Sequence, residues 1–181
     1  MNPSISVIIP NHNGKNLLNK AIPFVSAALK ESASNYEIIV SDDASDDGSV
    51  DWLGIEFPEV KVVASSENTG FSGAVNRGAG HASMDLIFIL NSDIIVEKNY
   101  FDTQFRYFLL PDTFGTMGTI CDPVSGRVMD SAKYTEWKFT SLSTTRNLRV
   151  GGPAPPRPPL PLNPLKGTLA HPPACRQARH L

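Results

Sequence analysis

The stretch Leu86–Asp93, L-I-F-I-L-N-S-D, decides the fold class of this chain. Five apolar residues run without a break and stop at a polar triplet, Asn91, Ser92 and Asp93. A short unbroken run of Leu, Ile and Phe is typical of a strand that is buried on both faces, as in a parallel sheet under helices. The triplet then falls at the carboxyl end of the strand, where ligands bind in open α/β sheets. On this stretch alone, a strand followed by ordinary turn residues is the stronger interpretation.

Similar apolar runs precede this stretch, and amphipathic patterns separate them. The alternation of strand and helix signals predicts an α/β fold with an open, mostly parallel sheet and helices on both faces. Two short strands are expected after the fourth helix, at 114–121 and beyond a turn at 122–128. The earlier strands are expected at 4–9 (ended by Pro10), 36–40, 60–64 and 86–90. Helices are expected after the caps Asn16, Ser49 and Ser72 and over about 98–110. Pro23 is expected to bend or divide the first helix.

Polar loops follow all four predicted strands, and in a parallel sheet these loops meet at one edge. Asp42 and Asp43 end the second strand. A carboxylate there can accept the N3–H of a uracil or thymine ring, or bind a ribose hydroxyl. The alternative is turn formation and helix capping, for which D-D-A-S-D-D-G-S is well suited.

The third loop contains glycines that do not have the spacing of a dinucleotide fingerprint or a P-loop. It runs into a helix N-terminus, which can receive a phosphate or a sugar hydroxyl. Asn76 and Arg77 lie just inside that helix, and Arg77 is expected either to face a diphosphate or to be a solvated surface charge. His12, in the first loop, can stack on a base, although a lone histidine is often structural.

Charge and proline content divide the chain in two. The last 31 residues hold nine of the 15 prolines, no acidic residue and four basic ones, so the first 150 residues hold all 18 acidic residues. We therefore expect a folded domain at 1–149 and a disordered proline-rich tail at 150–181. The acidic domain argues against nucleic-acid binding. The two cysteines match no metal or redox spacing, and together with the absence of a signal peptide they predict a cytoplasmic protein.

Four motifs together resemble family-2 glycosyltransferases of the GT-A fold. They are S-V-I-I-P-N-H-N, V-S-D-D-A-S-D-D-G-S, E-N-T-G-F-S-G-A-V-N-R-G and L-N-S-D, in the order that the family has them. The last two are most similar to the rhamnosyltransferase-type branch, and the resemblance covers residues 4–140. It implies an enzyme that transfers a sugar from a UDP- or dTDP-linked donor to a glycan or lipid-linked acceptor, and it leaves peripheral contact with the inner face of the membrane open.

The resemblance also implies roles for individual residues. Asp93 would hold a divalent metal, Mg²⁺ or Mn²⁺, with Asn91 at the first position of the D-x-D motif, where many members have Asp. Asp42 or Asp43 would bind the pyrimidine. The remaining nucleotide-sugar pocket would be formed by Pro10, His12, Asn68, Gly70, Phe71, Asn76 and Arg77.

No general base can be identified. In the family it belongs to an E-D motif in the second half of the domain, and Glu136 lacks that context. The chain therefore resembles the donor-binding half of the enzyme, continued by an unrelated tail that a frameshift or mispredicted gene end would produce. A genuine proline-rich linker is the alternative, and a non-catalytic nucleotide-sugar-binding module is the alternative function.

Overall fold

The computed structural model describes residues 3–33, 35–130, 133–138, 141–147 and 178–180. The chain divides into two compact units, one built mainly from Met1–Phe101 and the other from Asp102–Arg179. The first unit contains β1 (Ile5–Asn11), α1 (Lys15–Ser32), β2 (Tyr36–Asp43), α2 (Ser49–Glu56), β3 (Lys61–Ser65), α3 (Gly70–Ala79), β4 (Leu86–Ile89), β5 (Ile94–Val96) and the start of α4 (Tyr100–Phe105).

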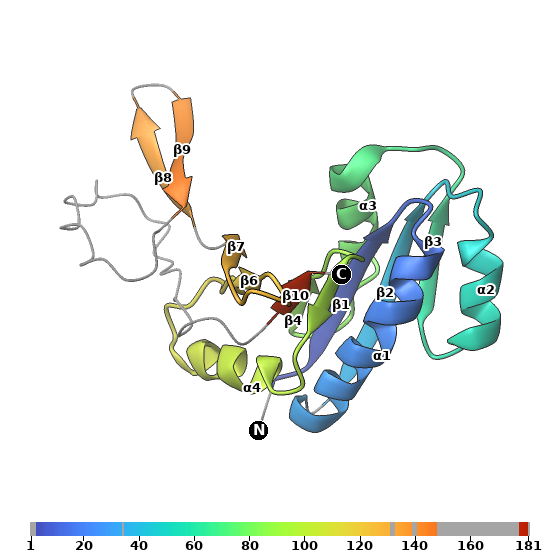
Figure 1. The fold of residues 1–181 in the computed structure, drawn as a ribbon, viewed down its shortest axis with the longest axis horizontal. Coiled ribbons are helices and arrows are strands. Elements are labelled where there is room, and N and C mark those ends of the chain that lie inside the picture. Colours follow the sequence, from blue (N-terminus) through green and yellow to red (C-terminus); the bar gives the residue numbers. More distant parts are fainter. Residues whose placement is uncertain (1–2, 34, 131–132, 139–140, 148–177, 181) are drawn as a thin grey trace. The chain divides into compact units, whose positions relative to one another are not determined.

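The first unit is an open parallel sheet with strand order β3-β2-β1-β4 (Figure 1). The connections β1–α1–β2 and β2–α2–β3 progress across the sheet in one direction, and β3–α3–β4 returns in the other. Since such crossovers are right-handed, α1 and α2 cover one face and α3 covers the other. The predicted fold class is confirmed, with helices on both faces.

Close packing holds α3 against the sheet at Gly78. A Cβ on Gly78 would lie 2.5 Å from Ile8 Cγ2 and 3.2 Å from Ser41 Cβ, so only glycine lets the helix approach this near. Strand alternation then places Val7 and Ile9 on the opposite face of the sheet. Val7, Ile8 and Ile9 are fully buried, which makes this strand the centre of the core.

The prediction that Pro10 ends the first strand is wrong. β1 continues to Asn11, and Pro10 and Asn11 pair with Ser41 and Asp42 of β2. The even-numbered residues of β1 bond towards β4, as the Leu90 N–H to Ile8 carbonyl bond shows. The missing N–H of Pro10 therefore falls on the β4 side, where pairing stops at Ile8, and it leaves the β2 ladder intact.

The expectation that the opening stretch is buried on both faces is also wrong. β4 is an edge strand of the described sheet, and its burial alternates. Ile87 is 51% exposed and Ile89 is 49% exposed, on the face that Ile8 shares, while Phe88 packs edge-on against Phe101 on the other face. Sequence alone could not place this strand at an edge.

The helix starts and stops also differ from the sequence expectations. Gly14, not Asn16, precedes α1, which runs through Pro23 without division. Pro23 is exposed, so the carbonyl it leaves unpaired can reach water. Likewise α2 and α3 begin at Ser49 and Gly70, so neither Ser49 nor Ser72 is the residue preceding its helix.

At the opposite end of the sheet, Glu37 joins two strands to the loop before β4. Its Oε1 accepts hydrogen bonds from Ser6 Oγ at 2.6 Å, Ser83 N at 2.7 Å and Ser83 Oγ at 2.8 Å. Burial works to raise the pKa of Glu37, but these bonds and Lys61 outweigh it and hold the pKa below its usual value. Glu37 therefore stabilises the fold in its charged form.

The second unit is described by its elements alone. The predicted helix at 98–110 is α4 followed by the 3₁₀ turn η1 (Arg106–Leu109). Of the predicted strand at 114–121, only β6 (Ile120–Cys121) forms, and β7 (Val128–Asp130) follows the expected turn. β6 pairs with β7 and with β10 (Ala178–His180), the one described part of the predicted tail. A hairpin of β8 (Lys133–Lys138) and β9 (Ser141–Asn147) completes the described residues.

Candidate functional site

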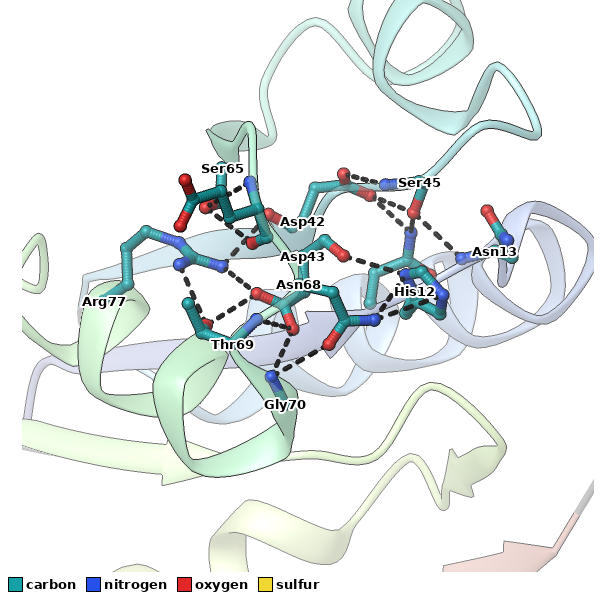
Figure 2. A network of polar contacts seen from close by, with 12 residues as sticks. His12, Asn13, Asp42, Asp43, Ser45, Ser65, Asn68, Thr69, Gly70 and Arg77 are labelled. Atoms are coloured by element: carbon teal, nitrogen blue, oxygen red, sulfur yellow. Dashed lines mark hydrogen bonds and ion pairs between the residues drawn. The ribbon is translucent and has the colours of Figure 1, made fainter.

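The loops after β1, β2 and β3 are bonded to one another at the carboxyl edge of the sheet. Asp43, at the end of β2, bonds to the loop before α3, and its carbonyl accepts a bond from His12 of the first loop (Figure 2). The turn after β4 also lies nearby, because a Cβ on Gly14 would be 3.6 Å from Ser92 Oγ. The predicted meeting of the loops at one edge is confirmed.

The Asp43 carboxylate is saturated by groups from the third loop and α3. Oδ1 accepts from Thr69 Oγ1 at 2.7 Å and Arg77 Nη2 at 2.8 Å, and Oδ2 accepts from Thr69 N at 2.9 Å and Gly70 N at 2.7 Å. A carboxylate offers about four lone-pair sites, and all are used. Asp43, which is 3% exposed, thus caps α3 from a neighbouring strand.

These bonds also fix the charge of Asp43. Burial works to raise the pKa of its carboxyl, but the Arg77 guanidinium, the Thr69 hydroxyl and the N–H groups of Thr69 and Gly70 outweigh burial and hold the pKa far below its usual range. Arg77 is consequently an ion-paired residue rather than a solvated helix arginine. Its Nη2 also donates to the Asp42 carbonyl at 3.1 Å.

Asp42 binds the first and second loops together. Its Oδ2 accepts from Asn11 Nδ2 at 2.8 Å, from Ser45 Oγ at 2.6 Å and more weakly from Ser49 Oγ at 3.4 Å. Its Oδ1 accepts only the Ser45 N–H, at 3.0 Å. Asp42 is 1% exposed, yet Oδ1 retains acceptor capacity that Asp43 lacks.

Further bonds make the first and second loops one rigid structure. Asn13 N donates to Ser45 Oγ and Asp46 N donates to Asn13 Oδ1, each at 2.8 Å. Asp47 Oδ2 accepts the Lys15 N–H at 2.9 Å, so α1 is capped by a residue 32 positions away. Asp47 also accepts the Ser49 N–H at 3.0 Å, so this part of the D-D-A-S-D-D-G-S run serves the start of α2, as the turn-and-cap alternative expected.

His12 and Asn68 form the exposed part of the network. His12 Nδ1 lies 2.8 Å from the Asp43 carbonyl, so Nδ1 carries the proton and donates it. Asn68 Nδ2 lies 3.5 Å from Nδ1 and 3.4 Å from Nε2. Because these distances are nearly equal, the amide lies over the ring face rather than in line with either nitrogen. His12 itself is exposed.

Asp93 and Asn91 occupy a turn closed by the Ile94 N–H to Asn91 carbonyl bond at 3.1 Å. Asn91 is exposed and Asp93 is half-buried. Within the described residues no three His, Cys, Asp or Glu side chains are grouped to hold a metal. One carboxylate with an amide oxygen still fits Mg²⁺ or Mn²⁺, because such ions take one or two carboxylates and complete their coordination with water and phosphate oxygens.

Other predicted site residues lie at this edge without joining the network. Phe71 is 59% exposed near the start of α3, Asn76 is exposed further along it, and Pro10 is half-buried in β1. The sequence analysis missed Asn11, Ser45 and Thr69, which carry much of the network. Their signal was their position within the polar loops that follow the strands, but Ser, Thr and Asn in turns have many possible local partners.

Comparison with known proteins places these motifs in a family. The family described as "Glycosyl transferase family 2" matches residues 6–152. A dolichol-phosphate mannosyltransferase of Pyrococcus furiosus is 36% identical over 95 residues, which are 50% of this chain and 26% of that protein. An uncharacterized glycosyltransferase of Haemophilus influenzae is 30% identical over 125 residues, 66% of this chain and 49% of that protein. The chain thus spans half or less of these relatives.

Solved structures share the fold. The mannosyltransferase PcManGT from Pyrobaculum calidifontis, in complex with GDP-Man and Mn²⁺, matches 67% of this chain and 36% of its own, with a TM-score of 0.55 and 20% identity. Residues 1–349 of S. aureus TarS, in complex with UDP-GlcNAc, match 73% of this chain and 39% of their own, with a TM-score of 0.59 and 20% identity. The fold is therefore GT-A-like, and the chain belongs to glycosyl transferase family 2.

Proposed function

We propose that this chain binds the donor of a glycosyltransferase reaction in which a sugar passes from a nucleoside diphosphate to a glycan or lipid-linked acceptor. The observation that carries the proposal is the network that joins three loops of a family-2 chain and leaves His12 exposed above it. Pre-formed polar groups at this edge of an α/β sheet are typical of nucleotide sites.

The base would be held by the first and second loops. The exposed ring of His12 would offer a stacking surface. Asp42 Oδ1, rather than the saturated Asp43, would accept the N3–H of a uracil or thymine ring. Arg77 would act indirectly, by holding Asp43 and with it Thr69 and Gly70 at the N-terminus of α3. Phe71 and Asn76 would line the sugar side.

The diphosphate would lie near the Asn91–Asp93 turn. A divalent cation bound there supplies charge neutralisation of the departing diphosphate. Asp93 would be its protein carboxylate ligand, and Asn91 would add an amide oxygen. No described residue is assigned as the general base. The donor would be of the type that rhamnosyltransferases use. The protein would work in the cytoplasm, in peripheral contact with the membrane where the acceptor is lipid-linked. No described helix has the length and apolar character needed to cross a bilayer.

Calorimetry with UDP and dTDP, with and without Mn²⁺, tests donor binding. We expect binding that tightens with Mn²⁺ and that loses the Mn²⁺ effect in Asp93→Ala, with the exposed Glu59→Gln as a matched control. Failure of both nucleotides to bind would refute the proposal. Retention of the Mn²⁺ effect in Asp93→Ala would remove Asp93 from the metal role.

Binding without transfer is a second candidate function. It is kept as a candidate because no described residue is assigned as the general base that transfer needs. Transfer from a panel of nucleotide sugars with Mn²⁺ separates the two. Donor binding without product would support the binding module, and product that depends on Asp93 would support the enzyme.

A further inference from the structure

The buried amide of Asn11 has an orientation that its neighbours determine. Asn11 is 3% exposed, and its Nδ2 donates to Asp42 Oδ2 at 2.8 Å, with Ser45 Oγ and Ser49 Oγ each at 3.2 Å. A flipped amide would place its oxygen against the Asp42 carboxylate. Oδ1 must therefore point away from the second loop.

Asn11 Oδ1 has no hydrogen-bond partner in the described structure, although it is buried. It contacts the position that a Cβ on Gly14 would occupy, and Ser92 Oγ lies 3.6 Å from the same position. Because Gly14 has no side chain, no Cβ stands between Asn11 Oδ1, which lacks a donor, and the Ser92 hydroxyl. Ser92 belongs to the turn that carries Asn91 and Asp93.

We propose that Asn11 and Ser92 are positioning residues of the donor site: when a nucleoside diphosphate and a divalent cation are bound, the Ser92 hydroxyl donates to Asn11 Oδ1. This bond holds the turn bearing Asp93 against the first and second loops. The inference rests on the proposed function and deepens it, because it states how the diphosphate end of the site is connected to the base end.

Two physical arguments support the contact. A buried amide oxygen without a donor is destabilising, so a movement that supplies one is favourable. The turn is closed by the backbone bond from the Ile94 N–H to the Asn91 carbonyl, and Ser92 and Asp93 are its two central residues. A shift that brings the Ser92 hydroxyl to Asn11 therefore also moves Asp93.

The test measures UDP binding by calorimetry to the full chain carrying Ser92→Ala, Ser92→Thr or Ser66→Ala. Ser66 is an exposed serine of the third loop and serves as the matched control. With Mn²⁺, we expect Ser92→Ala to weaken UDP binding about 3- to 10-fold, the value of one hydrogen bond, and Ser92→Thr to stay within about 2-fold of the wild type. In EDTA, and with UMP in place of UDP, all four proteins should bind equally.

The outcomes separate this inference from the proposed function. Wild-type protein that binds neither UDP nor dTDP overturns both. Wild-type protein that binds UDP with Mn²⁺, while Ser92→Ala binds it equally tightly, overturns only the positioning role. A loss in Ser92→Ala that is as large in EDTA as in Mn²⁺ also overturns it, because the contact would then not depend on the metal-bound diphosphate. Melting temperatures of all four proteins establish that each is folded.

Discussion

Replacing Asp43 by Asn should destabilise the first unit more than any other isosteric change in its loops. The carboxylate accepts four hydrogen bonds, two on each oxygen, and one comes from the Arg77 guanidinium. An amide in either orientation directs an NH₂ group at two donors and leaves the guanidinium without its charge partner. Removing one partner of a buried ion pair costs about 3–5 kcal/mol, a large share of the roughly 5–15 kcal/mol that stabilises a domain.

Urea unfolding of wild type, Asp43→Asn and Asp46→Asn measures this loss. Asp46 is exposed in the same loop and its carboxylate makes no hydrogen bond in the described structure, so its change should stay within about 0.5 kcal/mol. Equal stability of the two variants would refute the structural role of Asp43.

The pH dependence gives an independent check. The folded pKa of Asp43 lies far below the unfolded value of about 3.9, so its contribution is complete above pH ~5 and is lost as the pH falls towards the folded pKa. The difference between wild type and Asp43→Asn should therefore be constant from pH 5 to 8 and shrink below pH 4. A difference that grows on acidification would contradict the assigned sign.

Three further predictions concern the packing of α3, the charge of Glu37 and the exposed edge of β4. Gly78→Ala should destabilise by about 1–3 kcal/mol in urea unfolding because its Cβ meets Ile8, whereas Gly54→Ala, in open space on α2, should be neutral or stabilise by up to about 1 kcal/mol. Glu37→Gln should cost about 1–2 kcal/mol at pH 7 and approach wild type below pH 4, since the folded pKa is lowered; a pH-independent cost would contradict the charged role. The double substitution Ile87→Thr and Ile89→Thr should raise the soluble fraction on expression, because both side chains are half exposed on an edge strand. An unchanged soluble fraction would show that this edge does not cause aggregation.

The sequence was sufficient to predict that the loops meet, because the carboxyl ends of parallel strands must share an edge. It could not predict which loop residues would be partners. Asp47 caps α1 from 32 residues away, and Asp43 caps α3 from 26 residues away, whereas sequence signals for caps are local. The predicted caps at Asn16, Ser49 and Ser72 are wrong for that reason.

The burial of Leu86–Leu90 depended on sheet order, which apolar content does not determine. The same residues would be covered on both faces at the centre of a sheet. Within the described sheet, however, β4 has one neighbouring strand, β1, and is therefore an edge strand. The end of β1 depended on which neighbour each residue faces, because Pro10 interrupts pairing on one side alone. Both errors concern relations between strands, and neither changes the placement of the site.

The hydrogen bonds of the adjacent Asp42 and Asp43 give the two carboxylates different roles. Asp43 has no remaining lone pair, so a base could reach it only by displacing Thr69, Gly70 or Arg77. Asp42 Oδ1 accepts a single bond, from Ser45 N, and a shift of that serine would open it to a ligand. Asp42→Asn should therefore weaken UDP binding beyond what its loss of stability explains, when binding is measured well below the melting temperature. Once unfolded protein is accounted for, Asp43→Asn should weaken UDP binding less than Asp42→Asn does, and the reverse result would assign the base to Asp43.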